Sequence, residues 1–332
     1  MTSPYELALA RNHGYDFLGQ LWLHGVTRDV MDMVAQVPEL SAVLGAAPAD
    51  FDDLAATHQQ ILGFDVFPFQ SIFLDPSGLL GGTQTDRVLH AYAAAGFDFA
   101  TADSAGDHIG HQLAFLAFLC GAEADAWEDG LSAIAQAMQD RQTRFMQDHF
   151  LRWIAPLTLA VKQQAQPFYT ALAELTLSQV ADHVSEQAAG GVQDLVAPAP
   201  SFVLPTPPDL LADAKTSLKD IAEHLLRPVH SGLTLSRDDL TRLSRSLDLP
   251  RGFGDRVQML TNLMRAAVTY GLWEKLIGNL REVGADWQTA YTAVGAESPA
   301  LAEFVRPWAG QVERTIGLLE QIAQSKELVE DR

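Results

Sequence analysis

The sequence predicts an all-α protein, with one helical domain followed by a second, smaller helical domain. Apolar residues recur at helical spacing in most segments, and no segment shows the strict alternation of a half-buried strand. A proline-rich stretch before residue 214 separates two such helical regions. At 332 residues, the chain is long enough for two domains and a sizeable core.

Most of the expected helices lie in residues 1–191, which we predict to be the first domain. Local signals bound several of them, such as a capping side chain or a proline at the start and a glycine at the end. Asp50 is expected to cap one helix and Gly63 to stop it. We expect helices over residues 5–23, 28–37, 50–61, 85–95, 108–120, 125–149, 150–164 and 167–187. Residues 64–74 are too irregular for a helix, so we expect a loop that its four phenylalanines anchor in the core.

A semi-stiff linker and a C-terminal helical domain are expected to follow. Residues 192–213 hold five prolines and few charges, as in a linker. Residues 214–332 form the predicted second domain, whose role the sequence does not indicate. In it, Ser236 and Asp239 form a near capping box. The expected helices cover residues 236–247, 255–270, 273–283, 287–294 and 299–325.

The stretch 103–119 joins a polar loop to an apolar helix. Gly106 ends the loop, and Asp107 stands where an N-cap residue is expected. His108 and Gln112 lie four residues apart and share another face of the first turn. The apolar positions of the helix recur at helical spacing, at Ile109, Leu113, Leu116 and Cys120. Composition alone is compatible with an ordinary capped core helix.

Three motifs in this part of the chain resemble the signatures of one known family. Residues 107–115, Asp-His-Ile-Gly-His-Gln-Leu-Ala-Phe, resemble its Asp-His-x-x-x-Glu-Leu-x-Phe motif. Residues 67–73, Phe-Pro-Phe-Gln-Ser-Ile-Phe, resemble its Pro-Tyr-Glu-Ser-Val-Tyr loop, and residues 145–153 resemble its Phe-x-x-x-His-x-x-x-Trp helix. In order and spacing the motifs are similar to those of the TorD/DmsD/NarJ family, the chaperones that mature molybdenum redox enzymes, over roughly residues 5–185.

This resemblance implies a function for the chain. It would be a cytoplasmic chaperone and not an enzyme, without a cofactor of its own. It would bind the signal peptide or the immature form of a molybdopterin-type oxidoreductase during cofactor insertion and assembly. A homodimer is compatible with this role. The residues implied to bind the client, for example its twin-arginine signal peptide, are Phe67, Phe69, Gln70, Ser71, Phe73, Asp103, Asp107, His108 and Gln112.

Two of these positions depart from the family pattern. Gln70 and Gln112 replace acids, and both changes remove charge that would pair with arginine. Either the client differs, or other acids supply the charge. The candidate acids are Asp65, Asp75, Asp103 and Asp107. The aromatic loop is equally compatible with plain core packing.

The charge of the chain is uneven. Residues 1–214 hold 7 Lys and Arg against 26 Asp and Glu, a net charge of −19, whereas residues 215–332 hold 15 against 16, a net charge of −1. A negative field repels nucleic acid and attracts basic ligands. Solubility is an equally good explanation of the acidity.

Several classes of protein find little support in the sequence. We expect no membrane span and no secretory signal, because no apolar run reaches roughly 18 residues and the N-terminus lacks a basic region followed by an apolar one. Cys120 is the single cysteine and lies in an apolar helix, so we expect neither a disulfide framework nor a thiolate metal site. There is no glycine-rich phosphate loop and no Gly-x-Ser-x-Gly motif.

Two alternative functions stay open. An α-helical metal-dependent hydrolase could use His108 and His111, although no further ligand motif and no His-Asp dipeptide support it. A helical regulator could bind DNA through residues 228–270, where a helix-turn-helix pattern is conceivable but degenerate.

Overall fold

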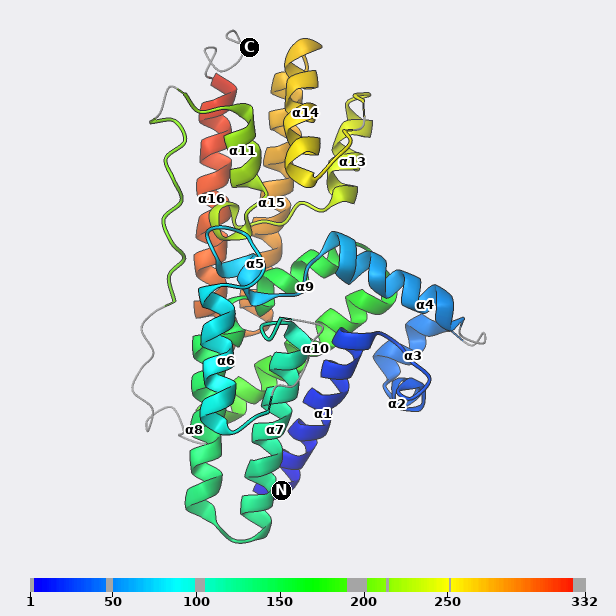
Figure 1. The fold of residues 1–332 in the computed structure, drawn as a ribbon, viewed down its shortest axis with the longest axis vertical. Coiled ribbons are helices and arrows are strands. Elements are labelled where there is room, and N and C mark those ends of the chain that lie inside the picture. The colour runs from blue at the N-terminus through cyan, green and yellow to red at the C-terminus, as the bar shows by residue number, and fades with distance from the viewer. Residues whose placement is uncertain are drawn as a thin grey trace. The chain divides into compact units, whose positions relative to one another are not determined.

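The computed structural model describes residues 3–45, 50–98, 105–189, 202–212, 215–250 and 252–324, and the regular elements in these ranges are helices (Figure 1). The all-α prediction is confirmed. The chain divides into two compact units. Unit 1 comprises Met1–Asp75, Leu79–Phe202 and Ser298–Leu301, and unit 2 comprises Pro76–Gly78, Val203–Glu297 and Ala302–Arg332. The boundaries that we expect at residues 191 and 214 stay predictions, and residues 192–201 and 213 of the expected linker lie outside the described residues.

Unit 1 is a bundle built around a long central helix, α7. Its regular elements are α1 (Pro4–His24), α2 (Met31–Gln36), α3 (Pro38–Leu44), α4 (Phe51–His58), a π-helix (Gln59–Asp65), α5 (Gln70–Leu74), α6 (Thr83–Ala95), α7 (Ile109–Glu128), α8 (Ser132–Asp148), a 3₁₀ turn (Phe150–Arg152), α9 (Ile154–Lys162) and α10 (Pro167–Ala189). Helices α1 and α7 lie side by side (Figure 1). A Cβ atom added to Gly110 on α7 would lie 2.8 Å from the carbonyl oxygen of Gly19 on α1, so the two backbones meet closely here because neither residue has a side chain.

Three local predictions for unit 1 are wrong. The helix after Asp50 does not stop at Gly63 but widens into the π-helix, and the buried side chains of Ile61 and Leu62 hold it there. The last five residues of the expected loop form α5 instead. Residues 125–149 are not one helix, because Gly130 adopts a φ of +70° in a turn between α7 and α8.

Unit 2 is also helical. Its helices are α11 (Leu218–Leu225), α12 (Pro228–Ser231), α13 (Arg237–Ser246), α14 (Arg256–Thr269), α15 (Trp273–Glu297) and α16 (Ala302–Gln324). The capping box of α13 is confirmed: Ser236 Oγ accepts a hydrogen bond from the Asp239 amide (3.1 Å), and the Asp239 carboxylate accepts one from the Ser236 amide (2.7 Å). The two helices expected over 273–283 and 287–294 are one helix, α15. It packs along α16, where Trp287 and Trp308 are fully buried.

Candidate functional site

The three sequence motifs meet where α7 begins. The amide of Gln70 donates to the carbonyl oxygen of Asp107 (3.1 Å), and the amide of Ile109 donates to that of Pro68 (2.9 Å). Together these bonds form a short antiparallel bridge between the segment before α5 and the segment before α7. We call this region the motif junction and define it by residues 67–73, residues 107–112 and Trp153.

Asp107 is the centre of the motif junction. Its side chain is fully buried. One carboxylate oxygen accepts from the Ser71 amide (2.7 Å) and the other from the Thr85 hydroxyl (2.8 Å). The expected N-cap role is therefore wrong: His108 is the N-cap of α7, and its Nδ1 accepts from the Gly110 amide (3.0 Å). Asp107 instead connects the beginnings of α5, α6 and α7.

The two glutamines that replace acids pair with each other. Gln112 Nε2 donates to Gln70 Oε1 (3.0 Å) and to the Asp107 carbonyl oxygen (3.2 Å). Gln112 Oε1 accepts from the indole of Trp153 (3.4 Å), and Gln70 Nε2 donates to Gln84 Oε1 (3.2 Å). Amides supply both donors and acceptors, so this buried pair needs no charge, whereas two carboxylates at the same distance would have to share a proton.

The aromatic loop, residues 64–74, has a buried side and an accessible side. Phe73 is 1% exposed and packs on Trp153 with ring centroids 5.6 Å apart. Phe69 contacts the ring of His108 edge-on at 4.9 Å and is partly exposed. Phe67 is partly exposed too, and Phe64 is 56% exposed.

The sequence-predicted site residues thus fall into groups. Fully buried are Gln70, Ser71, Phe73, Asp107 and Gln112, and His108 is 8% exposed. Among the predicted site residues that the structure describes, Phe67 and Phe69 are the two that are partly exposed. Asp103 lies outside the described residues. Sequence reasoning missed the exposure of Phe64, because a phenylalanine in an irregular segment without periodicity gives no local signal of the side it faces.

The comparisons with known proteins bear on this region. A family model described as "Nitrate reductase delta subunit" matches residues 29–158. Residues 29–158 belong to this family. The match contains the whole motif junction and confirms the family that the motifs resemble. Searches among curated proteins and among solved structures found no match.

The nitrate reductase delta family consists of NarJ/TorD-type chaperones that act in the maturation of molybdoenzymes and are not catalytic enzymes. Its members partner with nitrate reductase-type molybdoenzymes. None of the described helices is long and apolar enough to cross a membrane. Within the described part of the chain, no three His, Cys, Asp or Glu side chains are grouped so that they could hold a metal ion.

The histidines of the motif junction are neutral near neutral pH. Burial lowers the pKa of His108 to about 3, and the nearby His111 lowers it further. Burial also lowers the pKa of His111 to about 4, with His24 acting in the same direction and Asp107 against it. Neutral imidazoles neither repel a basic ligand nor pair with an acidic one.

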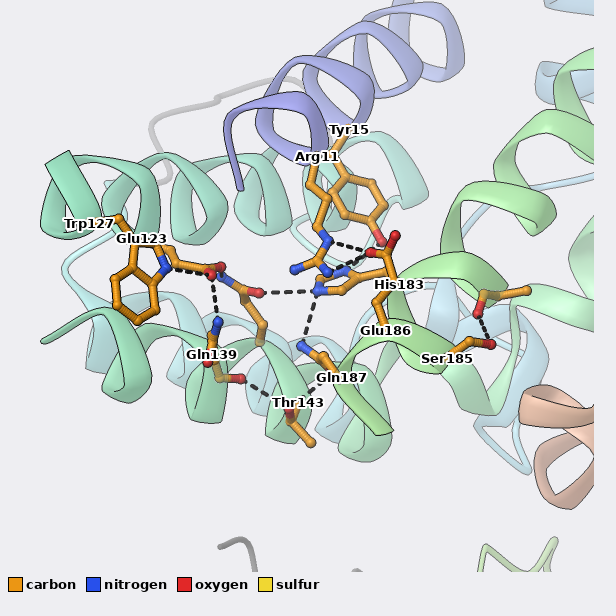
Figure 2. A network of polar contacts seen from close by, with 12 residues as sticks. Arg11, Tyr15, Glu123, Trp127, Gln139, Thr143, His183, Ser185, Glu186 and Gln187 are labelled. Atoms are coloured by element: carbon orange, nitrogen blue, oxygen red, sulfur yellow. Dashed lines mark hydrogen bonds and ion pairs between the residues drawn. The ribbon is translucent and has the colours of Figure 1, made fainter. Parts of the chain in front are cut away.

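A second polar cluster in the family-matched helices is structural (Figure 2). Glu123 is 1% exposed and accepts from Trp127 Nε1 (3.2 Å), Gln139 Nε2 (2.7 Å) and Gln142 Nε2 (2.9 Å). Three N–H donors therefore satisfy a buried carboxylate without a cation beside it. The cluster connects α7 with α8.

The protonation of the same cluster follows from its geometry. Burial holds the pKa of His183 well below its usual range, so the ring is neutral. The Gln142 amide donates to Glu123 and thus turns its oxygen to His183 Nε2, 3.1 Å away. Nε2 must carry the proton, and Nδ1 accepts from the Tyr15 hydroxyl (2.9 Å). Gln187 Oε1 accepts from the Thr143 hydroxyl (3.1 Å). These contacts tie α1 and α10 to α8 (Figure 2).

Proposed function

We propose that this protein is a cytoplasmic chaperone that binds the signal peptide or the immature form of a molybdopterin-type oxidoreductase during cofactor insertion and assembly. One observation carries the proposal: three motifs from distant parts of a family-matched segment converge on the motif junction. Membership of the delta family supports the coarser role of a maturation chaperone.

The burial of the junction decides which groups would meet a client. Asp107, Gln70 and Gln112 are at most 1% exposed, so their part is to hold the aromatic loop in place. Contact with the client falls to the accessible side of that loop. We assign it to Phe67 and Phe69, which are partly exposed. An apolar segment of a signal peptide matches this surface, because burial of apolar area provides most of the affinity of such a contact.

The basic end of a signal peptide would be attracted by the general field of the first domain. Residues 1–214 carry a net charge of −19, which speeds encounter with a cationic peptide. No charge comes from the glutamine pair. Of the described acids expected to replace it, Asp65 and Asp107 are buried and Asp75 is partly exposed, whereas Asp103 lies outside the described residues. Specific pairing with the client arginines is therefore assigned to Asp75 first.

A peptide-binding experiment tests the aromatic loop. The probe is a fluorescent synthetic peptide with two adjacent arginines followed by an apolar segment, and anisotropy reports its binding to the full chain. Phe67→Ala and Phe69→Ala should each raise Kd by about tenfold, as expected for one truncated apolar contact of about 1.4 kcal/mol. Phe253→Ala is the matched control, because Phe253 is 89% exposed in unit 2. Equal affinity of all three variants and the wild type would refute the assignment.

A kinetic experiment tests the electrostatic part. We expect the association rate to fall steeply between low and moderate salt, since the Debye length shrinks to about 10 Å at 0.1 M, while dissociation changes less. Replacing the two client arginines by lysines should weaken binding, because bidentate pairing is lost while the charge is kept. If the association rate does not depend on salt and the lysine-substituted peptide binds as tightly as the arginine peptide, the acidity serves solubility and not client binding.

The alternative functions gain no support from the described residues. The arginine-containing helix α13 neutralises part of its own charge, since Arg242 pairs with Asp238 and Asp239. The homodimer stays a proposal that sedimentation analysis can test.

A further inference from the structure

Unit 1 contains a cavity away from the residues of the motif junction. Its volume is about 280 Å³, and it is lined by α6, α7 and α8. Three alanines of α6 form one wall, and Phe115 and Phe145 provide aromatic surface. The remaining lining residues are polar: Arg141, Arg144, Asp148 and His149. The cavity is of the size that encloses a small organic molecule, and too small for a folded partner or an extended peptide.

His149 brings an unsatisfied polar atom to this cavity. Its side chain is 8% exposed, and Nδ1 is buried without a hydrogen-bond partner among the described residues. Leaving such an atom unpaired is unfavourable, because it has lost its hydrogen bond to water and gained none in the fold. Burial lowers the pKa of His149 to about 4, with Arg87 and Arg152 adding to the effect, so the ring is neutral and can donate one hydrogen bond from Nδ1.

The positive charge of the first domain is concentrated around the same place. Residues 1–214 contain only seven basic side chains. Four of them, Arg87, Arg141, Arg144 and Arg152, line the cavity or act electrostatically on His149. Arg152 pairs with Asp148 at 3.1 Å, but the other three form no ion pair with any described residue.

The remaining basic residues of the domain behave differently. Arg11 pairs with Glu186, and Lys162 pairs with Glu174. Arg28 packs over the ring of Phe51 at 4.9 Å. Residues 1–214 carry a net charge of −19, and within them three guanidinium groups without an ion pair among the described residues lie near an unsatisfied histidine, an arrangement that favours an anion.

We infer that this cavity binds a small organic anion, whose apolar body lies against the alanines and phenylalanines and whose phosphate or carboxylate group is held by Arg141, Arg144 and His149. Guanidinium groups match both oxyanions through paired N–H donors. A hydrogen bond from His149 Nδ1 would satisfy the atom that the fold leaves unpaired. The inference is independent of the proposed client binding, because none of the lining residues belongs to the motif junction.

Calorimetric titration of the full chain tests the inference, with phenyl phosphate as the probe. We expect saturable binding with a Kd of about 1 mM or lower. Inorganic phosphate lacks the apolar body and benzyl alcohol lacks the charge, so each should bind at least about tenfold more weakly. Benzoate, titrated in parallel, distinguishes a preference for carboxylate from one for phosphate.

Variants distinguish the cavity from a general attraction to cations. Arg141→Gln and Arg144→Gln should each weaken phenyl phosphate binding by at least about fivefold, because charge-assisted hydrogen bonds are lost. Arg28→Gln removes the same charge from an exposed site elsewhere in the unit and should change Kd less than about twofold. All three arginines are exposed, so the variants should fold, which circular dichroism checks.

The imidazole of His149 gives a second readout. Its ¹⁵N resonances in the wild type should shift on titration with phenyl phosphate, and the shift should disappear in Arg141→Gln/Arg144→Gln. The inference is overturned if neither phenyl phosphate nor benzoate binds below about 10 mM, or if inorganic phosphate binds as tightly as phenyl phosphate. It is also overturned if Arg28→Gln weakens binding as much as the cavity variants do.

Discussion

Replacing Asp107 should destabilise the protein far more than the loss of a helix cap would. The carboxylate is fully buried and accepts from the Ser71 amide at 2.7 Å and the Thr85 hydroxyl at 2.8 Å. Asp107→Ala removes both acceptors and opens a small void between α5, α6 and α7. Asp107→Ser restores a side chain that is good at capping but too short to reach the partners on α5 and α6.

The magnitude follows from the two donors. Each buried donor left without an acceptor costs about 1–3 kcal/mol, and the Thr85 hydroxyl can rotate in search of another acceptor, so its cost lies at the low end. We expect Asp107→Ala and Asp107→Ser each to lower the free energy of unfolding by about 2–4 kcal/mol. Asp107→Asn should cost only about 1 kcal/mol, because its oxygen can face the Ser71 amide while its nitrogen donates to Thr85 Oγ1.

Guanidinium denaturation followed by circular dichroism measures these differences. Thr85→Val completes a double-mutant cycle with Asp107→Ala, and we expect a coupling energy of about 1 kcal/mol. If Asp107→Ser is as stable as the wild type, the hydrogen bonds from Ser71 and Thr85 to the Asp107 carboxylate contribute nothing to stability. A loss below about 1 kcal/mol in Asp107→Ala would also refute the reasoning.

Four further predictions concern other parts of the chain. Gln112→Glu puts a carboxylate oxygen in place of the amide nitrogen Gln112 Nε2, which lies 3.0 Å from Gln70 Oε1. We expect this change to lower the free energy of unfolding by about 2–4 kcal/mol at pH 8. The loss should be smaller at pH 5, where the new carboxyl group is protonated and can donate. The pKa of His108 falls from 6.5 to about 3 on folding. The neutral ring therefore stabilises the fold fully above pH 6.5, and this stabilisation is lost as the pH falls, by up to about 1.4 kcal/mol in the free energy of unfolding per pH unit. His108→Asn, which can still cap α7, should flatten denaturation midpoints plotted between pH 4 and 6. Residues 1–202, expressed alone, should unfold in one cooperative transition by calorimetry, and a gradual melt would count against the domain boundary. Ser236→Ala should cost about 0.5–2 kcal/mol in urea denaturation, and Ser236→Asp should restore most of it.

The elements that the sequence predicts correctly are those whose ends carry a local signal. Helix α6 ends at Gly96, which adopts the left-handed conformation, and α13 begins at the Ser236 capping box. The errors occur where tertiary contacts override a local signal. Gly63 is a helix breaker in isolation, yet burial of Ile61 and Leu62 keeps the chain helical around it.

The candidate site could be predicted in its members but not in their roles. The order and spacing of the motifs predict that Phe69, Asp107 and Gln112 belong to one site, and the fold places them together in the motif junction. The partner of each polar group could not be predicted, because Asp107 accepts from residues 36 and 22 positions earlier in the chain. Sequence spacing within one helix says nothing about such contacts, and for that reason the sequence predicts a cap at Asp107, where the fold has a buried side chain that connects three helices.

The third family motif, residues 145–153, shows that residues at a regular helical spacing can contribute to two different sites. Phe145, His149 and Trp153 are each four residues apart, which in one continuous helix would place them on one face. The helix ends at Asp148, His149 leaves helical geometry with φ −127° and ψ −73°, and a 3₁₀ turn follows. Phe145 and His149 therefore line the cavity, whereas Trp153 donates to Gln112 in the motif junction. His149, at the end of α8, therefore marks a bend in the chain between the cavity and the motif junction. Residues 145–153 are better understood as this bend, which separates two surfaces, than as one face of a helix that binds a single ligand.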